Sequence, residues 1–308
     1  MLFRSKAAPK YEMAILYNPE EEMPPSDEKA VSRFTKAAES VGLGAELVSR
    51  DDYARLAEFD ALFIRETTRV GHHTYRFSRR AEAEGLVVMD DPESILKCTN
   101  KVYLAELFHR YGVPQPRTVL VHKENVEHAG RELGFPLVLK QPDASFSQGV
   151  VKVRDEKSLV EQATQFLEDS ELFIAQEFVP TDFDWRIGII DRQPLYACRY
   201  FMVNGHWQIY KTDSGGKRRS GRSETIPVEL APREVLRVAT KAANLIGDGF
   251  YGVDVKQSGD RCYLIEVNDN PSIDSGVEDA VLKEELYRRI ISVFLKRIER
   301  RKAGLDRL

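Results

Sequence analysis

Cysteine and histidine are scarce in this sequence, which limits the disulfide and metal chemistry that it can support. The cysteines are Cys98, Cys198 and Cys262, which lie far apart and form no CxxC pair. This spacing argues against a disulfide framework or a zinc site and predicts a cytoplasmic protein. Of six histidines, only His72 and His73 are neighbours. Adjacent side chains on a strand point to opposite faces, so we interpret this pair as part of a polar loop.

The sequence also lacks a strong excess of charge and a long apolar run. Its 45 basic and 49 acidic residues leave a formal net charge of −4, which does not predict a nucleic-acid partner. No apolar run reaches membrane-spanning length, so no membrane association is expected. Residues 1–18 carry basic side chains but only a short apolar run. We interpret them as a tail and a strand rather than a signal peptide.

What the sequence does contain is a globular balance, with 42% hydrophobic and 31% charged residues. A chain of 308 residues predicts two or three subdomains. In residues 1–97, apolar runs at 13–17, 61–65 and 86–89 are typical of buried strands. The apolar spacing over residues 27–41 predicts a helix between the first two. This alternation predicts a small parallel α/β domain.

The rest of the chain predicts two α+β lobes. Residues 98–180 mix helical periodicity with short alternating strands. Residues 181–308 contain closely spaced strands of antiparallel type, with Asn204-Gly205 as a strong hairpin signal. A final amphipathic helix is expected over residues 281–300.

The segment YGVDVKQSGDRCYLIEVN, residues 251–268, predicts two antiparallel strands with acidic side chains on one face. By strand alternation, Glu266 and Asn268 share a face. If the turn has an odd number of residues, Asp254 lies opposite Leu264, with Glu266 as its diagonal neighbour. Two carboxylates and an amide oxygen then converge from adjacent strands.

These converging oxygens have two interpretations. Like charges held this close repel each other unless a cation lies between them. Oxygen donors select a hard ion, and Mg²⁺ fits best, with phosphate and water completing its shell. The alternative is a solvated hairpin face that is followed by a turn at Asn270-Pro271. The residues alone leave both interpretations open.

A second segment, FPLVLKQPDASFSQGVVKV, has the features of a phosphate-binding loop. Lys140 ends an apolar strand, where its ammonium can reach a phosphate. Ser145, Ser147 and Gly149 follow in a loop whose N–H groups and hydroxyls can surround phosphate oxygens. The loop matches neither the Walker A nor the GxGxxG pattern. An ordinary hairpin turn is the alternative. Lys101 opens a helix and lies either near the same anion or on the surface.

Polar residues elsewhere add weaker signals. The stretch QEFV after a strand can present backbone groups to a purine ring. Arg186 and Arg199 are expected on neighbouring strands, where they could clamp a phosphate or carboxylate. An ion pair between Asp184 and Arg186 is the structural alternative. A basic loop either closes over an acidic substrate or is a solvated turn; its residues are Lys217, Arg218, Arg219 and Arg222.

The ordered motifs resemble the ATP-grasp superfamily, and within it the RimK-like carboxylate–amine (glutamate) ligases. They are TNKVYLAELFHRYGVPQPRT, FPLVLKQPDASFSQGVVKV, AQEFV, DWR, YGVDVK and IEVNDNP. The resemblance implies an α/β and α+β architecture, the ATP-grasp fold. Its expected parts are a pre-ATP-grasp α/β domain (1–97), a central lobe (98–180) and a C-terminal lobe (181–308).

The resemblance also implies roles for individual residues. The implied Mg²⁺ ligands are Asp254, Glu266 and Asn268. The implied ATP contacts are Lys101, Lys140, Ser145, Ser147, Gly149, Gln176, Glu177, Phe178, Val179 and Asp184, with Gln176 to Val179 as the adenine hinge. Arg199 becomes a contact of the γ-phosphate or acyl phosphate, and Arg186 a contact of a substrate carboxylate or phosphate. Ala144 and Phe146 depart from the glycine-rich loops of many relatives.

The implied function is an ATP-dependent ligase that activates a carboxylate as an acyl phosphate and joins it to an amine. The expected cofactors are ATP and Mg²⁺, with Mn²⁺ as an alternative metal. The expected partners are an acidic amino acid or peptide and an amine acceptor, and relatives suggest a homo-oligomer. The competing hypothesis is an ATP-binding regulatory or scaffold protein with an inactive site.

Overall fold

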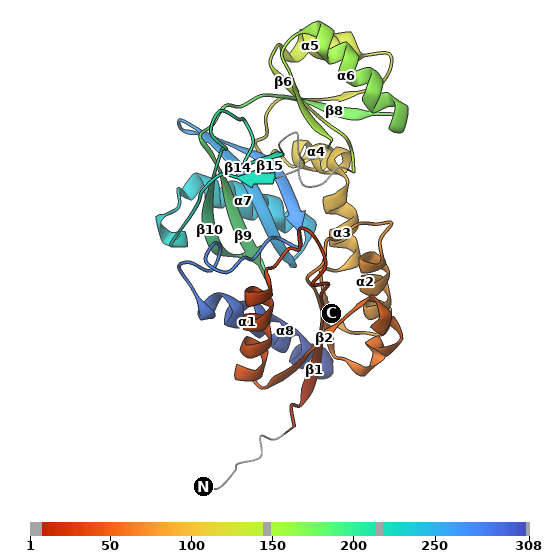
Figure 1. Cartoon of the computed structure of the whole chain (residues 1–308), viewed down its shortest axis with the longest axis vertical. Coiled ribbons are helices and arrows are strands. Elements are labelled where there is room, and N and C mark those ends of the chain that lie inside the picture. Colours follow the sequence, from red (N-terminus) through yellow and green to blue (C-terminus); the bar gives the residue numbers. More distant parts are fainter. Residues whose placement is uncertain (1–7, 144–148, 213–217, 306–308) are drawn as a thin grey trace. The chain divides into compact units, whose positions relative to one another are not determined.

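A computed structural model describes residues 8–143, 149–212 and 218–305 of the chain (Figure 1). By contacts between residues, the chain divides into two compact units. The first consists of residues 1–95 and 270–308, and the second of residues 96–269. This division differs from the expected three-domain boundaries, because residues 270–308 join the N-terminal unit instead of the preceding lobe. The three-domain boundaries stay a prediction.

The first unit is built on a parallel sheet with the strand order β2-β1-β3-β4. These strands are β1 (Tyr11–Leu16), β2 (Leu43–Val48), β3 (Ala61–Ile64) and β4 (Val87–Met89). All four residues of β3 are buried, as expected for a parallel strand whose two faces are both covered. The expected parallel α/β arrangement is confirmed.

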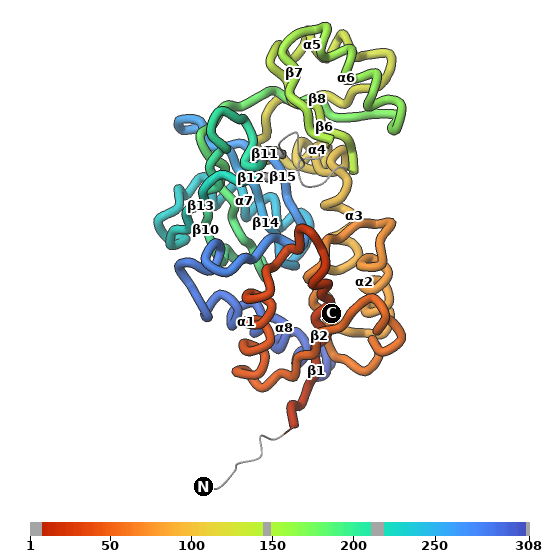
Figure 2. The backbone as a smooth tube through the Cα atoms, in the orientation of Figure 1, coloured from red at the N-terminus to blue at the C-terminus, as the bar shows by residue number. Residues whose placement is uncertain are grey.

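Helices cover both faces of this sheet. They are α1 (Glu28–Ser40), α2 (His73–Ala83) and α8 (Glu284–Lys302), with the 3₁₀ segment η1 (Arg50–Glu58). Phe63 of β3 packs against Phe34 of α1 and Phe294 of α8. Leu62 of β3 faces the other way and joins the cluster that contains Phe77 of α2. Figure 2 shows the C-terminal segment with α8 in blue beside the N-terminal segment in red.

The second unit begins within helix α3 (Pro92–Thr99) and contains two larger antiparallel sheets. The first has the strand order β5-β8-β6-β7, and α5 and α6 pack on it around one apolar cluster. Its elements are β5 (Thr118–Val121), α5 (Val126–Leu133), β6 (Leu137–Lys140), β7 (Val150–Val153), α6 (Glu156–Asp169) and β8 (Phe173–Glu177). Helix α4 (Lys101–Arg110), which precedes them in the chain, buries Leu104 and Phe108 in the core of the other large sheet.

The other large sheet has the strand order β13-β10-β9-β14-β15 and packs its apolar face on α7. Its elements are β9 (Phe183–Ile190), β10 (Gln193–Phe201), β13 (Ser223–Ile226), η2 (Val228–Leu230), α7 (Arg233–Ile246), β14 (Phe250–Ser258) and β15 (Arg261–Asp269). A small ladder, β11 (Tyr210–Thr212) with β12 (Arg218–Ser220), lies between β10 and β13 in sequence.

The sequence predicts a hairpin in which the strands before and after Asn204-Gly205 pair with each other. This pairing is wrong. The local turn does form, with Gly205 at φ +70° and a hydrogen bond from His206 N–H to Val203 O of 2.8 Å. The place beside β10, however, is taken by β13, not by the segment that follows the turn. Within the part of the chain that the structure describes, no helix is long and apolar enough to cross a membrane.

Candidate active site

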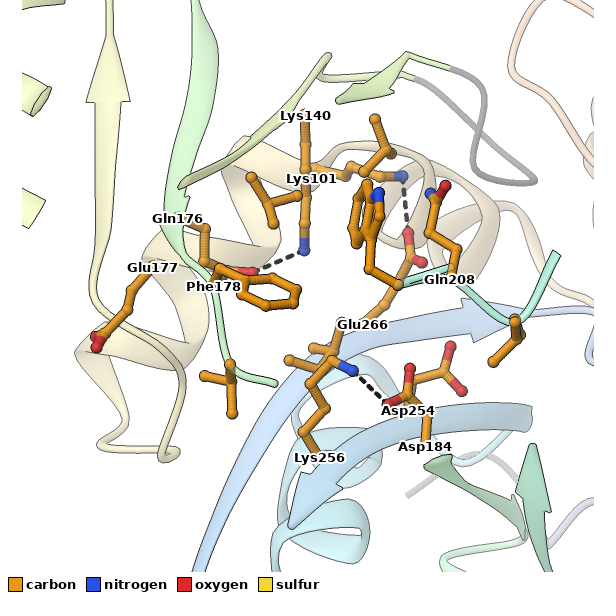
Figure 3. Close-up of a pocket in the computed structure, with 16 residues that line it drawn as sticks. Lys101, Lys140, Gln176, Glu177, Phe178, Asp184, Gln208, Asp254, Lys256 and Glu266 are labelled. Carbon is orange, nitrogen blue, oxygen red and sulfur yellow. Dashed lines mark hydrogen bonds and ion pairs between the residues drawn. The ribbon is translucent and has the colours of Figure 1, made fainter. Parts of the chain in front are cut away.

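A cavity of about 130 Å³ lies in the second unit, and we call it the central cavity (Figure 3). Its walls come from α4, β6, β7, the end of β8, β9, the loop at 207–209, and the β14–β15 hairpin. Many residues expected in the site line it: Lys101, Lys140, Gln176, Glu177, Phe178, Val179, Asp184, Asp254 and Glu266. Segments far apart in sequence therefore meet here as expected.

The acidic hairpin pairs in a register that the odd-turn prediction had wrong. Only two residues connect β14 to β15, since Ser258 pairs with Arg261. A β-bulge at Ile265 then shifts the ladder by one more residue, so Asp254 lies directly opposite Glu266 instead of Leu264. The two carboxylates are a direct cross-strand pair, which brings them closer than the expected diagonal would.

Each of these carboxylates has a cationic partner. Lys101 Nζ lies 2.7 Å from Glu266 Oε1. Arg186 forms a bidentate ion pair with Asp254. Its Nε donates to Oδ1, and its Nη2 donates to Oδ2 at 2.9 Å. The Asn268 amide donates to Asp254 Oδ2 at 3.4 Å. Asp254, Glu266 and Asn268 therefore lie together with cations that neutralise the charges, but Asn268 directs its amide N–H, not the expected amide oxygen, at Asp254.

The surroundings give the two carboxyl groups different proton affinities. Burial raises the pKa of Asp254, and the Arg186 guanidinium only partly offsets this effect. Burial acts on Glu266 in the same direction, but the ammonium groups of Lys101 and Lys140 outweigh it and lower the pKa of Glu266. Glu266 is consequently the more firmly ionised member of the pair.

Lys140 stands at the end of β6, as the apolar run predicted, with its ammonium in the central cavity. Its Nζ donates to Gln176 Oε1 at 2.8 Å, and Gln176 Nε2 donates to Thr118 Oγ1 at 3.0 Å. Burial lowers the pKa of Lys140 to about 8. Gly149, at φ +66°, accepts from Gln141 N–H through its carbonyl at 2.9 Å.

Lys101 is placed by the cap of its helix. The Asn100 side chain accepts from Tyr103 N–H at 2.9 Å, which makes Lys101 the first residue of α4. The Lys101 N–H donates to Pro142 O at 3.0 Å and ties α4 to the segment after β6. Both lysines expected near an anion thus reach one cavity. Ser145 and Ser147 lie outside the described residues.

The segment after β8 supplies an aromatic wall. Lys152 Nζ lies 3.3 Å from the Phe178 ring centroid, and the Trp207 ring meets Phe178 edge-on at 6.0 Å. Glu177 pairs with Arg117 at 3.1 Å and points away from the other labelled side chains (Figure 3). The two rings form an apolar wall of the cavity, whereas the Glu177 carboxylate is directed elsewhere.

The family of the chain follows from comparison with known proteins. The RimK-like ATP-grasp domain matches residues 98–292. The chain belongs to the RimK-like ATP-grasp family. Alpha-aminoadipate–LysW ligase LysX of Sulfolobus acidocaldarius is 29% identical over 258 residues, which are 79% of this chain and 84% of that protein. A probable alpha-L-glutamate ligase of Thioalkalivibrio sulfidiphilus is 28% identical over 229 residues, or 73% of each chain.

Solved structures share the fold. D-alanine–D-alanine ligase of Bacillus anthracis matches with a TM-score of 0.69 at 18% identity, covering 94% of this chain and 99% of that one. The expected ATP-grasp fold is confirmed. As a RimK-like protein, the chain is an ATP-dependent ligase that joins a carboxylate to an amine and uses ATP and Mg²⁺.

The donors at the central cavity of this RimK-like chain suit Mg²⁺. Over residues 8–143, 149–212 and 218–305, no three His, Cys, Asp or Glu side chains are grouped to hold a metal ion. The donor set is instead two carboxylates, Asp254 and Glu266, with the Asn268 amide. Mg²⁺ is commonly bound through one or two carboxylates together with substrate phosphates and water. Rotation of the Asn268 amide would present its oxygen to the ion.

Arg199 is an expected site residue that the structure places on the opposite face of the sheet. In the antiparallel pairing of β9 with β10, Arg186 lies opposite Cys198, and Arg199 lies opposite Trp185. The two arginines therefore occupy opposite faces of the sheet. Arg199 pairs with Glu224 at 2.7 Å and lies 5.6 Å from the Trp185 ring centroid. This position argues against the phosphate contact expected of Arg199.

Asp184 has a different partner from the one expected, and that partner was missed. Lys256 Nζ lies 2.5 Å from Asp184 Oδ1 and 2.7 Å from Thr181 Oγ1. Asp184 is thus paired with Lys256, while Arg186 is paired with Asp254. Strand alternation could have found Lys256, because it lies two residues after Asp254 on the same face. Trp207 and Ile265 were also missed; only the tertiary fold and the bulge bring them to the cavity.

Proposed function

We propose that the chain activates the carboxylate of an acidic amino acid or peptide as an acyl phosphate and joins it to an amine. The observation that carries this proposal is the set of three ion pairs at the central cavity. They are Lys101–Glu266, Arg186–Asp254 and Lys256–Asp184. The relatives named for alpha-aminoadipate and alpha-L-glutamate support an amino acid with a second carboxylate as a substrate.

When the nucleotide binds, the charged groups of these ion pairs would exchange partners: the carboxylates would turn to the metal ion and the cations to the phosphates. Asp254, Glu266 and Asn268 would hold Mg²⁺, and Lys101 and Lys140 would contact the phosphates. The ion, when bound, neutralises phosphate charge and favours in-line transfer to the carboxylate. Cations that now face carboxylates become available to phosphate oxygens, so no buried charge is left unpaired. Mn²⁺ can replace Mg²⁺ at oxygen donors of this kind.

The chain itself contributes positioning and electrostatic stabilisation, not a covalent nucleophile. Charged donors around the phosphates hold carboxylate and phosphorus in line, which converts binding energy into rate. Arg186 lies on the sheet face that carries Asp254 and can turn to the acyl phosphate as it forms. The rings of Phe178 and Trp207 would enclose the adenine.

Entry of ATP requires the central cavity to widen. Its volume of about 130 Å³ is below the roughly 300–1,000 Å³ typical of pockets for drug-sized ligands. We expect Trp207 to move relative to Phe178 when ATP binds, because both rings line the cavity and touch each other edge-on. The other tryptophan, Trp185, is buried in the core, so a fluorescence change on ATP binding would report mainly on Trp207.

The variant Glu266→Gln tests the proposed site. Removal of this charged contact should lower Mg²⁺-dependent ADP release by about 10²–10³-fold, as found for other preorganised groups. ADP release is measured over amino acids, peptides and acidic protein tails, and the products are identified by mass spectrometry. Glu177→Gln is the matched control, because Glu177 lines the cavity but points away. Circular dichroism checks that both variants fold.

Unchanged turnover in Glu266→Gln contradicts the metal site. The scaffold hypothesis has its own outcome: Trp207 fluorescence responds to Mg·ATP, but no acceptor gives ADP. A cytoplasmic location and a homo-oligomer complete the proposal, based on the cysteine pattern and the family.

A further inference from the structure

A second cavity adjoins the central cavity and has no part in the proposed phosphate chemistry. It has a volume of about 680 Å³ and is lined by residues 181–182, 201–206 and 219–222. We call it the arginine cavity. Thr181 in its wall accepts a hydrogen bond from Lys256, which lines the central cavity. The loop after β10 separates the two, with 203–206 on one side and 207–209 on the other.

The charged groups of the arginine cavity favour an anion. Among the residues that the structure describes, Arg219 and Arg222 line it against a single carboxylate, that of Asp182. Neither arginine forms an ion pair or a side-chain hydrogen bond with a residue that the structure describes. Other arginines of the second unit, among them Arg186, Arg199 and Arg237, pair with a nearby carboxylate. Two guanidinium groups thus face one hollow, and neither is paired with a carboxylate of the described residues.

Arg222 is held in place by its backbone and by an aromatic ring. A Cβ atom on Gly221 would lie 1.8 Å from the Phe201 carbonyl oxygen, so only glycine allows this close approach. The approach lets the Phe201 N–H donate to the Arg222 carbonyl at 2.9 Å. The Arg222 guanidinium then stacks 3.6 Å from the Phe201 ring centroid. Stacking orients the group and leaves its N–H donors free for a ligand.

We infer that the arginine cavity binds an acidic peptide segment of the substrate, through carboxylates held by Arg219 and Arg222. This inference rests on the proposed function and specifies its substrate class. Guanidinium groups bind carboxylates through two parallel hydrogen bonds, and two such groups match two acidic side chains. The volume lies in the range of pockets for ligands well above the size of one amino acid.

Direct binding of a model peptide tests the inference. The probe is a fluorescein-labelled tetraglutamate peptide with both ends blocked, and its anisotropy is read without nucleotide on the full-length protein. The double variant Arg219→Gln/Arg222→Gln should bind it at least about tenfold more weakly, because charge-assisted hydrogen bonds are lost. Binding to the wild type should weaken with added salt.

A charge-matched control separates local contacts from net charge. Arg131→Gln/Lys157→Gln removes the same charge from α5 and α6, where both side chains are at least 66% exposed. This variant should bind the probe like the wild type. The variant Gly221→Ala should also weaken binding, since it displaces Arg222 without removing a charge.

Several results would overturn the inference. One is that the arginine double variant binds the probe as tightly as the wild type does. Another is that the control variant loses as much affinity as the arginine double variant. A third is that the wild type binds a tetraglutamine peptide as tightly as tetraglutamate. Competition by N-acetylglutamate as effective as that by unlabelled tetraglutamate would overturn the assignment to a peptide. Peptide binding is measured without nucleotide, so it can be observed even if the wild type has no ligase activity. Conversely, a failure to bind the peptide does not affect the measurement of ADP release in Glu266→Gln.

Discussion

Lys140 differs from the other cations of the central cavity in having an amide as its hydrogen-bond partner. Lys101, Lys256 and Arg186 each contact a carboxylate, whereas Lys140 donates to Gln176. An amide oxygen compensates less of the cost of burying a charge than a carboxylate does. Burial accordingly lowers the pKa of Lys140 to about 8, and this makes the lysine sensitive to pH near neutrality.

The affinity for ATP should therefore fall as the pH rises through about 8. Phosphate contact requires protonated Lys140, so above its pKa the binding of ATP takes up a proton. The Kd for ATP should weaken by up to about tenfold per pH unit between pH 8 and 9.5. Titration of Trp207 fluorescence with ATP measures this. Lys140→Arg remains charged and should keep its affinity across that range; an equal fall in this variant would contradict the assignment to Lys140.

The same shift acts on stability with a defined sign. The pKa of Lys140 in the folded chain, about 8, lies below the ordinary value of 10.5. Between these values the unfolded chain binds more protons than the folded one. The contribution of Lys140 to the free energy of unfolding therefore rises over this range as the pH increases. Below about pH 8 the cost of burying the charge is fully present.

At the scale of elements, strand alternation predicted which residues share a face, but it could not predict which residues pair. The faces of Glu266 and Asn268 follow from alternation within one strand. The position of Asp254 depends on turn length and on the bulge at Ile265, and a bulge leaves no clear mark in the sequence. Arg199 was misplaced for the same reason, since its face relative to Arg186 depends on the register of β9 with β10.

Which strands pair with each other could not be predicted from the sequence either. The Asn204-Gly205 turn is a local property, and it formed as the sequence predicted. The pairing of β10 with β13 joins segments more than twenty residues apart and depends on packing over the whole sheet. The cavity walls follow from such long-range pairings, which explains why Trp207 was missed while Lys140 was found.

Gly188 of β9 is required by the way β9 and β10 pack. A Cβ atom at this position would lie 2.2 Å from a carbon of the buried Tyr196 ring of β10. Gly188→Ala should lower the free energy of unfolding by about 1–3 kcal/mol through overpacking. Urea unfolding measures this. Gly71→Ala, where a Cβ meets nothing within 4 Å, is the control and should change stability little.

A double-mutant cycle with Tyr196→Ala isolates the contact. If the ring causes the strain, Gly188→Ala should cost less in the Tyr196→Ala background than in the wild type. Equal costs in the two backgrounds would place the strain elsewhere.

At the scale of the whole molecule, the first unit is assembled from both ends of the chain. Its first segment ends at residue 95, while the boundary expected at residue 97 stays a prediction. The return of residues 270–308 was not foreseen, because a helix pattern does not reveal the sheet on which the helix packs. Asn270, at φ +45°, starts this return and accepts a hydrogen bond from Arg65 at 2.7 Å.

Arg65 joins the two segments of the first unit and is fully buried. Its guanidinium donates to Ser26 Oγ at 2.7 Å and to Pro271 O at 3.0 Å, besides Asn270 and the Pro25 carbonyl. Arg65→Met would leave these buried acceptors without a donor, at about 1–3 kcal/mol for each one that water cannot reach. We expect the first unit to be destabilised by about 3 kcal/mol or more.

Hydrogen exchange followed by mass spectrometry can locate this loss. In Arg65→Met, peptides that cover β1 and β3 should exchange faster, while peptides of β9 and β14 keep their protection, since local opening follows cooperative units. Arg55→Met is the control: Arg55 belongs to the same unit, but its partners Glu46 and Glu58 are exposed, and such pairs contribute about 0–1 kcal/mol. Equal loss of protection in both units would show that they unfold together, and Arg65 would then stabilise the whole chain rather than one unit.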